Sequence, residues 1–309
     1  MQNYGQYAHN LLVRGRLAAA QSEFPRAAML AEQALAHFQA LGLRSAVNQT
    51  LIFLGYIAWA CGNYDEASNR LQGSLALASE LPVKELPLWA RNWLGWIACA
   101  CGHDGQEALF QENVASAGDT HFSILVAWSL QGLGYLAYWR GETDQAVVLL
   151  SEGLAILEQV GWTIDRAFML NNLARAVQAQ GDSPRAAALW RESLVLSRDL
   201  GDRWKIAMAL EGLAGLSAAR RQPERAAWLY GAAEALREAI GVPLWPSLRA
   251  EYDDIVARVG ARLGVVAFDA AWAGGRALPL DAAIDAAQDS SAERDIATPI
   301  VAPSGPSHP

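Results

Sequence analysis

Two cysteines and a histidine lie within a five-residue stretch, at Cys99, Cys101 and His103. Thiolates and imidazoles are the ligands that zinc prefers, so this cluster is the first candidate for a metal site. On a helix, however, side chains two positions apart point about 200° away from each other, and Cys99 and Cys101 then cannot share an ion. Cys61 and Cys101 each stand between an alanine and a glycine, a context typical of a small buried residue before a turn. We therefore expect packing at these cysteines and no metal site.

Residue types used in other catalytic and nucleotide-binding sites are present, but their spacing does not match the motifs of such sites. The sequence has no GxSxG motif around which a serine nucleophile could be built. Its two lysines, Lys84 and Lys205, both lack the Gly-Lys-Ser/Thr context of a P-loop, so ATP hydrolysis would have to come from another chain. The Gly274-Gly275 pair follows a predicted helix rather than a strand, and acidic residues such as Glu152 fall on outward helix faces. We expect no enzymatic activity and no cofactor.

Composition narrows the class of protein further. The chain has 309 residues, of which 52% are hydrophobic, with twelve tryptophans, a net charge of -8 and three cysteines. So many large apolar residues indicate a folded chain, whereas the acidic balance argues against nucleic-acid binding, which needs a basic face. An odd, small number of cysteines does not form a disulfide framework, and no apolar run approaches the roughly 18 residues of a membrane span. We expect a cytoplasmic protein that binds neither membranes nor nucleic acid.

A repeat of 39 or 40 residues organises most of the chain. A small residue preceded by an apolar or basic one returns at six anchor positions: Gly15, Gly55, Gly95, Gly134, Ala174 and Ala214. Seven residues after each anchor stands a helix breaker or polar residue: Ser22, Gly62, Gly102, Gly141, Gly181 and Arg221. Alanine follows twelve residues after the anchor in five of the six copies, at Ala27, Ala67, Ala146, Ala186 and Ala226, and slips by one to Ala108 in the third. The register predicts six copies of one structural unit.

Each unit is predicted to be a pair of helices joined by a turn. Apolar residues three and four apart, as at Leu94, Ile97 and Ala98, indicate a first helix, and a second amphipathic helix follows the breaker. Small residues at the anchor and twelve positions later allow the two helices to cross closely, so a larger side chain at Gly95 or Ala146 should cost about 1–3 kcal/mol. One pair cannot bury its own apolar stripe, but stacked pairs can.

The first helices of stacked pairs line the concave side, which gives a candidate binding site. Positions three and four apart around each anchor share one face and carry rings, amides and one cation. The residues are Tyr56, Trp59, Trp89, Asn92, Trp96, Trp128, Gln131, Tyr135, Tyr138, Trp139, Asn171 and Arg175. In the sixth unit the same face thins to Met208, Glu211, Gly215 and Ala218.

Two interpretations of this aromatic strip compete. The rings can pack between neighbouring first helices, since tryptophan and tyrosine are usually buried where they can be. Alternatively they form an exposed groove, in which rings supply contact area, amides bind a peptide backbone or hydroxyls, and Arg175 meets an anion. We favour the groove because the opposite face has a packing set of its own, for example Leu54 and Ile57.

The anchor, the alanine twelve residues later and the leucine before most anchors resemble the tetratricopeptide repeat. The period, longer than the usual 34 residues, resembles the lengthened repeats of large bacterial LuxR-type and related ATPase-containing transcriptional regulators. The C-terminal segments 225–244, 249–264 and 268–287 are similar to the closing part of those regulators. The resemblance implies an all-α, right-handed α-solenoid of about six helix pairs with a C-terminal helical cap. It also implies a regulatory arm that acts on a P-loop ATPase module.

The expected organisation has three parts. Residues 1–241 form the helical repeats, 242–288 a capping module that includes amphipathic stretches at 246–263 and 265–272, and 289–309 a disordered tail rich in Ser and Pro. The expected function is a non-enzymatic interaction or sensor module that binds a peptide or small effector in its concave groove. The alternative is a structural or oligomerising arm, or a remnant of a larger regulator, whose aromatic strip packs against a partner copy.

Overall fold

The computed structural model describes residues 2–83, 85–103, 106–116 and 123–289, and over these residues the fold is entirely α-helical. Fifteen helices and no strands occur in this part of the chain. They are α1 (Gln2–Ala20), α2 (Phe24–Ala40), α3 (Arg44–Ala60), α4 (Tyr64–Ala78), α5 (Glu85–Cys101), α6 (Glu107–Ser116), α7 (Ser123–Trp139), α8 (Thr143–Gln159), α9 (Arg166–Ala179), α10 (Ser183–Leu200), α11 (Arg203–Ala219), α12 (Pro223–Ile240), α13 (Pro246–Leu263), α14 (Val265–Arg276) and α15 (Leu280–Gln288).

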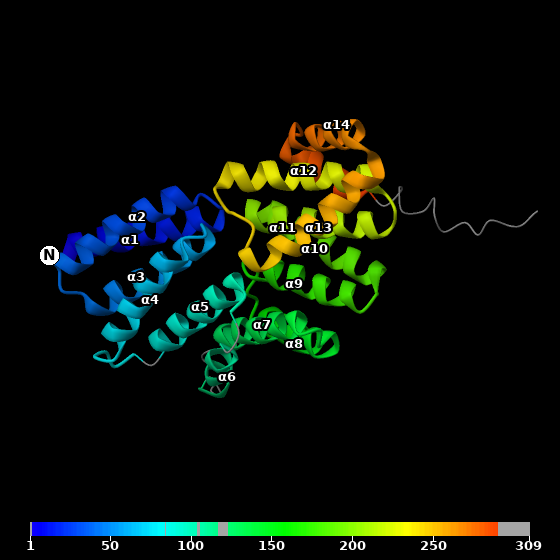
Figure 1. Ribbon diagram of the computed structural model, residues 1–309. Coiled ribbons are helices and arrows are strands. Elements are labelled where there is room, and N and C mark those ends of the chain that lie inside the picture. The colour runs from blue at the N-terminus through cyan, green and yellow to red at the C-terminus, as the bar shows by residue number, and fades with distance from the viewer. Residues whose placement is uncertain (1, 84, 104–105, 117–122, 290–309) are drawn as a thin grey trace, which may run out of the picture.

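Six helix pairs, from α1/α2 to α11/α12, stack in chain order (Figure 1). Within each pair the odd-numbered helix carries the anchor, and consecutive helices pack against one another along the whole array. The prediction of an all-α solenoid of tetratricopeptide-like helix pairs is confirmed. None of the described helices is both long enough and apolar enough to span a lipid bilayer.

The turn inside each pair is where the sequence predicted a break. All six predicted breakers have a left-handed backbone conformation, with φ of 61° at Ser22, 59° at Arg221 and 72–90° at the four glycines. In this conformation the next residue bonds back to the first helix, as where the N–H of Glu23 donates to the carbonyl oxygen of Ala18 at 2.8 Å. Glycine adopts this conformation without strain, whereas Ser22 is held in it by hydrogen bonds to Asp202 and Trp204.

The anchors are small because the two helices of a pair touch there. A Cβ atom built on Gly95 would lie 2.5 Å from Cζ of Phe110 in α6, and one on Gly134 would lie 2.6 Å from Cγ of Leu150 in α8. Ala146, twelve residues after Gly134, is fully buried. The predicted reason for the small residues, close crossing of the first and second helices, is confirmed at these positions.

The array curves so tightly that its first and sixth units touch. The hydroxyl of Ser22, in the α1–α2 turn, donates to Oδ1 of Asp202 at 3.1 Å and accepts from the backbone N–H of Trp204 at 3.0 Å. The ring of Phe24 lies edge-on to that of Trp204, with centroids 6.0 Å apart. Asp202 also forms a buried ion pair with Lys205 at 2.7 Å. This contact between the first and sixth units, which we call the closure contact, leaves a narrow concave face.

The chain after α12 turns back into that concave face. Trp245, in the segment between α12 and α13, is buried, and a Cβ atom on Gly62 would lie 2.7 Å from Cγ of Pro243. The hydroxyl of Tyr135 in α7 lies 3.4 Å from that of Ser247. Helix α13 crosses the inner side of the array, and α14 lies against α12 (Figure 1). Both helices begin where the sequence predicted, at Pro246 and Val265, but α13 lies across the concave face, with Leu248 and Val259 buried, rather than only at the end of the solenoid.

The division of the chain into repeats, cap and tail stays a prediction. Helices α13, α14 and α15 fall within the predicted capping module, 242–288. The predicted disordered tail, 289–309, lies outside the described residues apart from Asp289.

Candidate binding site on the concave face

The structure brings most of the predicted site residues together on the inner side of the array, but it buries their largest rings. Trp59 is 1% exposed, Trp96 0% and Tyr135 2%. These side chains pack against one another and against rings from later in the chain. We call the resulting cluster the aromatic core; it consists of Trp59, Trp96, Tyr135, Phe168, Trp204 and Trp245.

The aromatic core joins distant units through ring contacts of 5–6 Å. The ring centroid of Trp59 lies 5.3 Å from that of Trp204 and 5.4 Å from that of Trp245. Trp245 also lies 5.5 Å from Tyr135. The tilted and edge-on geometries of these pairs are those that aromatic quadrupoles favour. A single residue of the α12–α13 segment thus fills the space between the second and fourth units.

The prediction that the large rings of units two to four line an exposed groove is therefore wrong, whereas the alternative of a structural or oligomerising arm, or a remnant of a larger regulator, stays a prediction. The first and sixth units meet at the closure contact, and Trp245 fills the concave face between units two and four. A strip that is buried within one chain needs no second chain to cover it. Packing of the rings, the other interpretation of the strip, is what the structure contains.

The three amides of the strip are also buried in the interior. Oδ1 of Asn92 accepts from the hydroxyl of Ser129 at 3.3 Å, and Nδ2 of Asn171 donates to the carbonyl oxygen of Lys205 at 3.1 Å. Neither amide atom of Gln131 has a hydrogen-bonding partner among the described residues. These amides face protein groups and do not line an open groove.

The remaining predicted residues lie at the edges of the interior. Tyr56 and Trp89 are partly buried against the core, and Trp128 donates from Nε1 to Asp165 at 3.0 Å. Trp139 is 40% exposed. Tyr138 and Arg175, the last two of the twelve, line a cavity. Binding of a ligand by any of the twelve stays a prediction.

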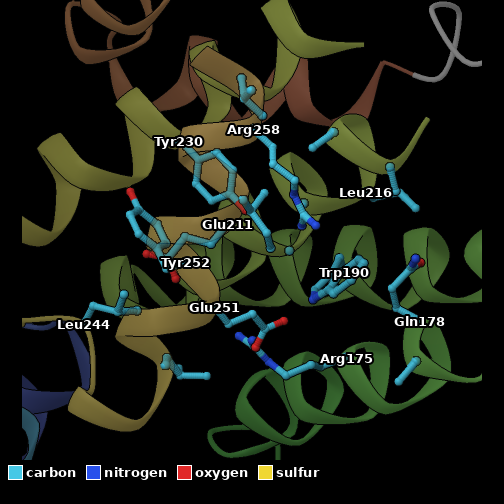
Figure 2. A pocket seen from close by; sticks show the side chains of 18 of the residues that line it. Arg175, Gln178, Trp190, Glu211, Leu216, Tyr230, Leu244, Glu251, Tyr252 and Arg258 are labelled. Atoms are coloured by element: carbon cyan, nitrogen blue, oxygen red, sulfur yellow. The ribbon is translucent and has the colours of Figure 1, made fainter. Parts of the chain in front are cut away.

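The cavity has a volume of about 490 Å³ and lies on the concave face of the fifth and sixth units (Figure 2). Its residues come from six helices and from the segment before α13. They are Tyr138, Arg175, Gln178, Ala179, Trp190, Glu211, Gly212, Gly215, Leu216, Ala218, Ala219, Tyr230, Leu244, Leu248, Glu251, Tyr252, Ile255, Arg258, Val259 and Arg262. We call this space the concave pocket. Its volume is within the range of about 300–1,000 Å³ that is typical of small-molecule sites.

The pocket is present because the inner-face positions of the sixth unit carry no aromatic residues. The positions that carry Tyr135 and Tyr138 in the fourth unit carry Gly215 and Ala218 in the sixth, and both line the pocket. The space that rings fill earlier in the array is left open here. The sequence predicted this thinning of the stripe but not the cavity that results from it.

Helix α13 supplies the opposite wall, which sequence reasoning missed. Leu248, Tyr252, Ile255 and Val259 recur every three or four residues and therefore share one face of α13, and all four line the pocket. The apolar face of a terminal cap would have the same spacing, and charged residues such as Arg258 flank the apolar face of any amphipathic surface helix. No feature of the sequence therefore distinguishes a cavity wall from a cap.

Buried ionisable groups surround the pocket. Arg237 binds both carboxylate oxygens of Glu211, with Nη2 2.8 Å from Oε2. Burial raises the pKa of the Tyr230 and Tyr252 hydroxyls above that of an ordinary tyrosine, and the Glu211 carboxylate adds to both shifts. Burial alone would lower the pKa of Arg175, but the neighbouring Tyr138 and Glu251 outweigh it and the pKa rises. Both tyrosines are therefore neutral and Arg175 is charged over the whole physiological range.

The first helix carries a second surface of note. Tyr4, Tyr7, Val13 and Leu17 on α1 are all more than half exposed. In the register of the repeat Val13 and Leu17 correspond to Phe53 and Ile57 of α3, which are buried. Val13 and Leu17, four positions apart, thus form an exposed apolar surface on α1, whereas Tyr4 lies on the opposite side of the helix.

A helical array with a cavity on its concave face, and no cluster of three His, Cys, Asp or Glu residues suited to a metal in the described part of the chain, defines a helical-repeat protein with a candidate ligand pocket. The tetratricopeptide repeat family matches residues 169–200, which cover most of α9 and all of α10. A search of curated proteins found no match. This region is thus tetratricopeptide-like, and such repeats are typically non-catalytic modules for protein interaction.

Proposed function

We propose that this chain is a non-enzymatic sensor module that binds a small effector in the concave pocket and passes the binding event to a protein partner. The observation that carries the proposal is the composition of the pocket wall. Tyr138, Arg175 and Gly215 belong to the repeats, whereas Tyr252 and Arg258 belong to α13. A ligand in contact with both walls stabilises one position of α13 against the array, which is the differential interaction that a sensor requires.

The apolar face of α1 supports a protein partner. Contiguous exposed apolar residues on a helix are characteristic of interaction surfaces, and Val13 and Leu17 occupy positions that later units bury. By the resemblance to LuxR-type regulators, the partner would be a P-loop ATPase module in a signalling or transcriptional pathway. The chain itself lacks a P-loop, so it would act on that ATPase from outside the nucleotide site.

A cavity-filling variant tests the binding role of the pocket. A Cβ atom on Gly215 would lie 3.4 Å from the hydroxyl of Tyr230, so Gly215→Leu places its side chain in the pocket. The matched control is Gly73→Leu in α4, where nothing lies within 4 Å of the new Cβ. The probes are 2-naphthamide and 2-naphthoate, measured by saturation-transfer NMR and titration calorimetry.

We expect the wild-type chain and Gly73→Leu to bind at least one probe, and Gly215→Leu to bind neither while its circular dichroism is unchanged. Absence of binding to the wild-type chain, or equal binding to Gly215→Leu, would refute the pocket as the effector site.

The partner is tested separately. The proteins that the wild-type chain captures are compared with those captured by Leu17→Glu, which places a charge on the α1 face. Gly215→Leu, which leaves α1 unchanged, is the control. The captured protein is then assayed for ATP hydrolysis. We expect Leu17→Glu to lose the partner and Gly215→Leu to retain it. A partner without ATPase activity would contradict the proposed regulatory role.

A further inference from the structure

The charged groups of the concave pocket do not balance one another. Five of them line it: Arg175, Glu211, Glu251, Arg258 and Arg262. The carboxylate of Glu211 is already bound through both oxygens by Arg237, which reaches it from outside the pocket lining. Of the three arginines, Arg258 is paired with Asp254 at 3.2 Å, and Nη1 of Arg262 donates to the carbonyl oxygen of Ala218 at 3.1 Å. Arg175 and the carboxylate of Glu251 are therefore the charged groups most available to a ligand.

Arg175 is the most enclosed of the three cations. It lies on α9, and its side chain extends into the pocket toward α13 (Figure 2). Within the described part of the chain no carboxylate lies within 4 Å of its guanidinium nitrogens, although Glu251 is near enough to influence its pKa. Its side chain interacts with the hydroxyl of Tyr138. An enclosed guanidinium without a salt bridge retains donors that suit a carboxylate.

Arg258 lies at the rim of the pocket on the opposite wall. It belongs to α13, its side chain is 64% exposed, and in the view of Figure 2 it lies between Tyr230 and Leu216. Its ion pair with Asp254 at 3.2 Å is exposed to solvent, so it holds the guanidinium only weakly. Arg175 and Arg258 thus present positive charge from two different elements to the same space.

Between the two cations the walls are aromatic and aliphatic. The rings of Tyr230 and Tyr252 meet edge to face with centroids 5.0 Å apart. Trp190 and Ile255 are part of the apolar lining. A flat, apolar body can contact these rings, whereas a strongly hydrated polyanion would lose its water without replacement on this side.

We propose that the ligand of the concave pocket is a small organic anion, a flat apolar body that carries one carboxylate directed at Arg175 and within the field of Arg258. This inference rests on the proposed function of the pocket and names its ligand class. Glu251 sets the limit on charge: it disfavours ligands with several negative charges and leaves net attraction for one.

Three matched probes test the class of ligand. 2-Naphthoate, 2-naphthamide and 2-naphthylmethylammonium share one apolar body and differ in charge. Their affinities for the full chain are measured by titration calorimetry at pH 7. We expect 2-naphthoate to bind about tenfold more tightly than the amide, and the ammonium compound to bind most weakly.

Variants assign the preference to particular residues. Arg175→Met should weaken binding of 2-naphthoate about tenfold and remove its advantage over 2-naphthamide, while Arg175→Lys retains part of it. Glu251→Gln should strengthen binding of 2-naphthoate several-fold because it removes the opposing charge. Arg14→Met, at an exposed position on α1, is the matched control and should change nothing.

The outcomes separate this inference from the proposed function. If 2-naphthamide or the ammonium compound binds as tightly as 2-naphthoate, and Gly215→Leu blocks it, the pocket is a binding site but the ligand is not an anion. If 2-naphthoate binding survives Gly215→Leu, or no probe binds, both proposals fail. Should Arg175→Met not fold, Arg258→Gln on exposed α13 replaces it, with a loss of 2-naphthoate affinity of about threefold expected and no loss refuting the inference.

Discussion

The concave face of this array is built in two ways along its length. In units two to four it is filled with rings, from Trp59 through Trp96 to Tyr135, which pack against Trp245. In units five and six the same face encloses a cavity of about 490 Å³. The helix pairs of both regions share a small anchor, a left-handed turn and the same order of helices, although the anchor is glycine in units two to four and alanine in units five and six.

The two regions differ in the size of the side chains at equivalent positions. Where the fourth unit has Tyr135 and Tyr138, the sixth has Gly215 and Ala218. Rings on the inner face produce a core that supports the curvature, whereas small residues opposite a helix of the chain itself produce a pocket. The comparison teaches that an aromatic stripe on a solenoid predicts a binding groove only if nothing later in the chain returns to cover it.

The largest expected effect is at the centre of the filled region. Trp96→Ala removes a fully buried ring that contacts Phe168, Tyr135 and Trp245. It should lower the free energy of unfolding by about 3–5 kcal/mol. Urea unfolding followed by circular dichroism measures it. A loss below about 1 kcal/mol would mean that the ring is not core and would restore the groove.

A smaller effect is expected at high pH. Burial raises the pKa of Tyr56, beside the aromatic core, from 10.0 to about 12. Between these values the unfolded chain has lost the phenolic proton and the folded chain retains it, so the contribution of Tyr56 to stability is constant below pH 10 and is lost as the pH rises from 10 to 12. A shift of about two units corresponds to roughly 2–3 kcal/mol.

Tyrosinate absorbance and helix content, recorded together during an alkaline titration, test this coupling. We expect the buried tyrosines to ionise only as the helices unfold. Full ionisation of all eight tyrosines near pH 10 with helix content intact would show that the interior is open to solvent.

The helix crossings that both regions share should respond more moderately. Gly95→Leu forces its side chain against Phe110, 2.5 Å from the position of the new Cβ. The cost should be about 1–3 kcal/mol, visible as a lower melting temperature. Gly73→Leu is the control, with no neighbour within 4 Å and no expected loss. Equal melting temperatures for the two variants would contradict close crossing at the anchor.

The smallest effect is expected at the edge of the filled region. Trp139 is 40% exposed and its ring touches Tyr135 and Tyr138 at centroid distances of 6.1 Å. Trp139→Ala should change the free energy of unfolding by less than about 1 kcal/mol. A loss as large as that of Trp96→Ala, in the same urea experiment, would erase the distinction between the core and its edge.

Local features of the fold could be predicted from the sequence, and its closure could not. The period placed all six turns, even where Ser22 and Arg221 stand in place of glycine. It also placed the close crossings, because each depends on residues within one unit. The curvature of the array, by contrast, is the sum of small rotations between units, and no single residue encodes it.

The candidate site could be predicted only in part, because only one of its walls is encoded by the repeat. The rule for the inner face found Tyr138 and Arg175, and it placed Glu211 and Gly215 on the correct side of the sixth unit. The other wall comes from α13, whose return into the array depends on tertiary packing of Trp245. Periodicity describes which face a residue occupies, but not which distant segment covers that face.

The closure contact has a consequence for synthesis of the chain on the ribosome. Ser22 and Asp202 are 180 residues apart, and at about 5–20 residues per second the ribosome needs on the order of 10–40 s to make the second after the first. In most solenoids each unit can fold as it leaves the ribosome, but here the first unit can form its contacts with the sixth only after the sixth has been synthesised. During that interval the tryptophans of the inner face are accessible to chaperones, which makes the nascent chain, rather than the finished protein, the species most dependent on them.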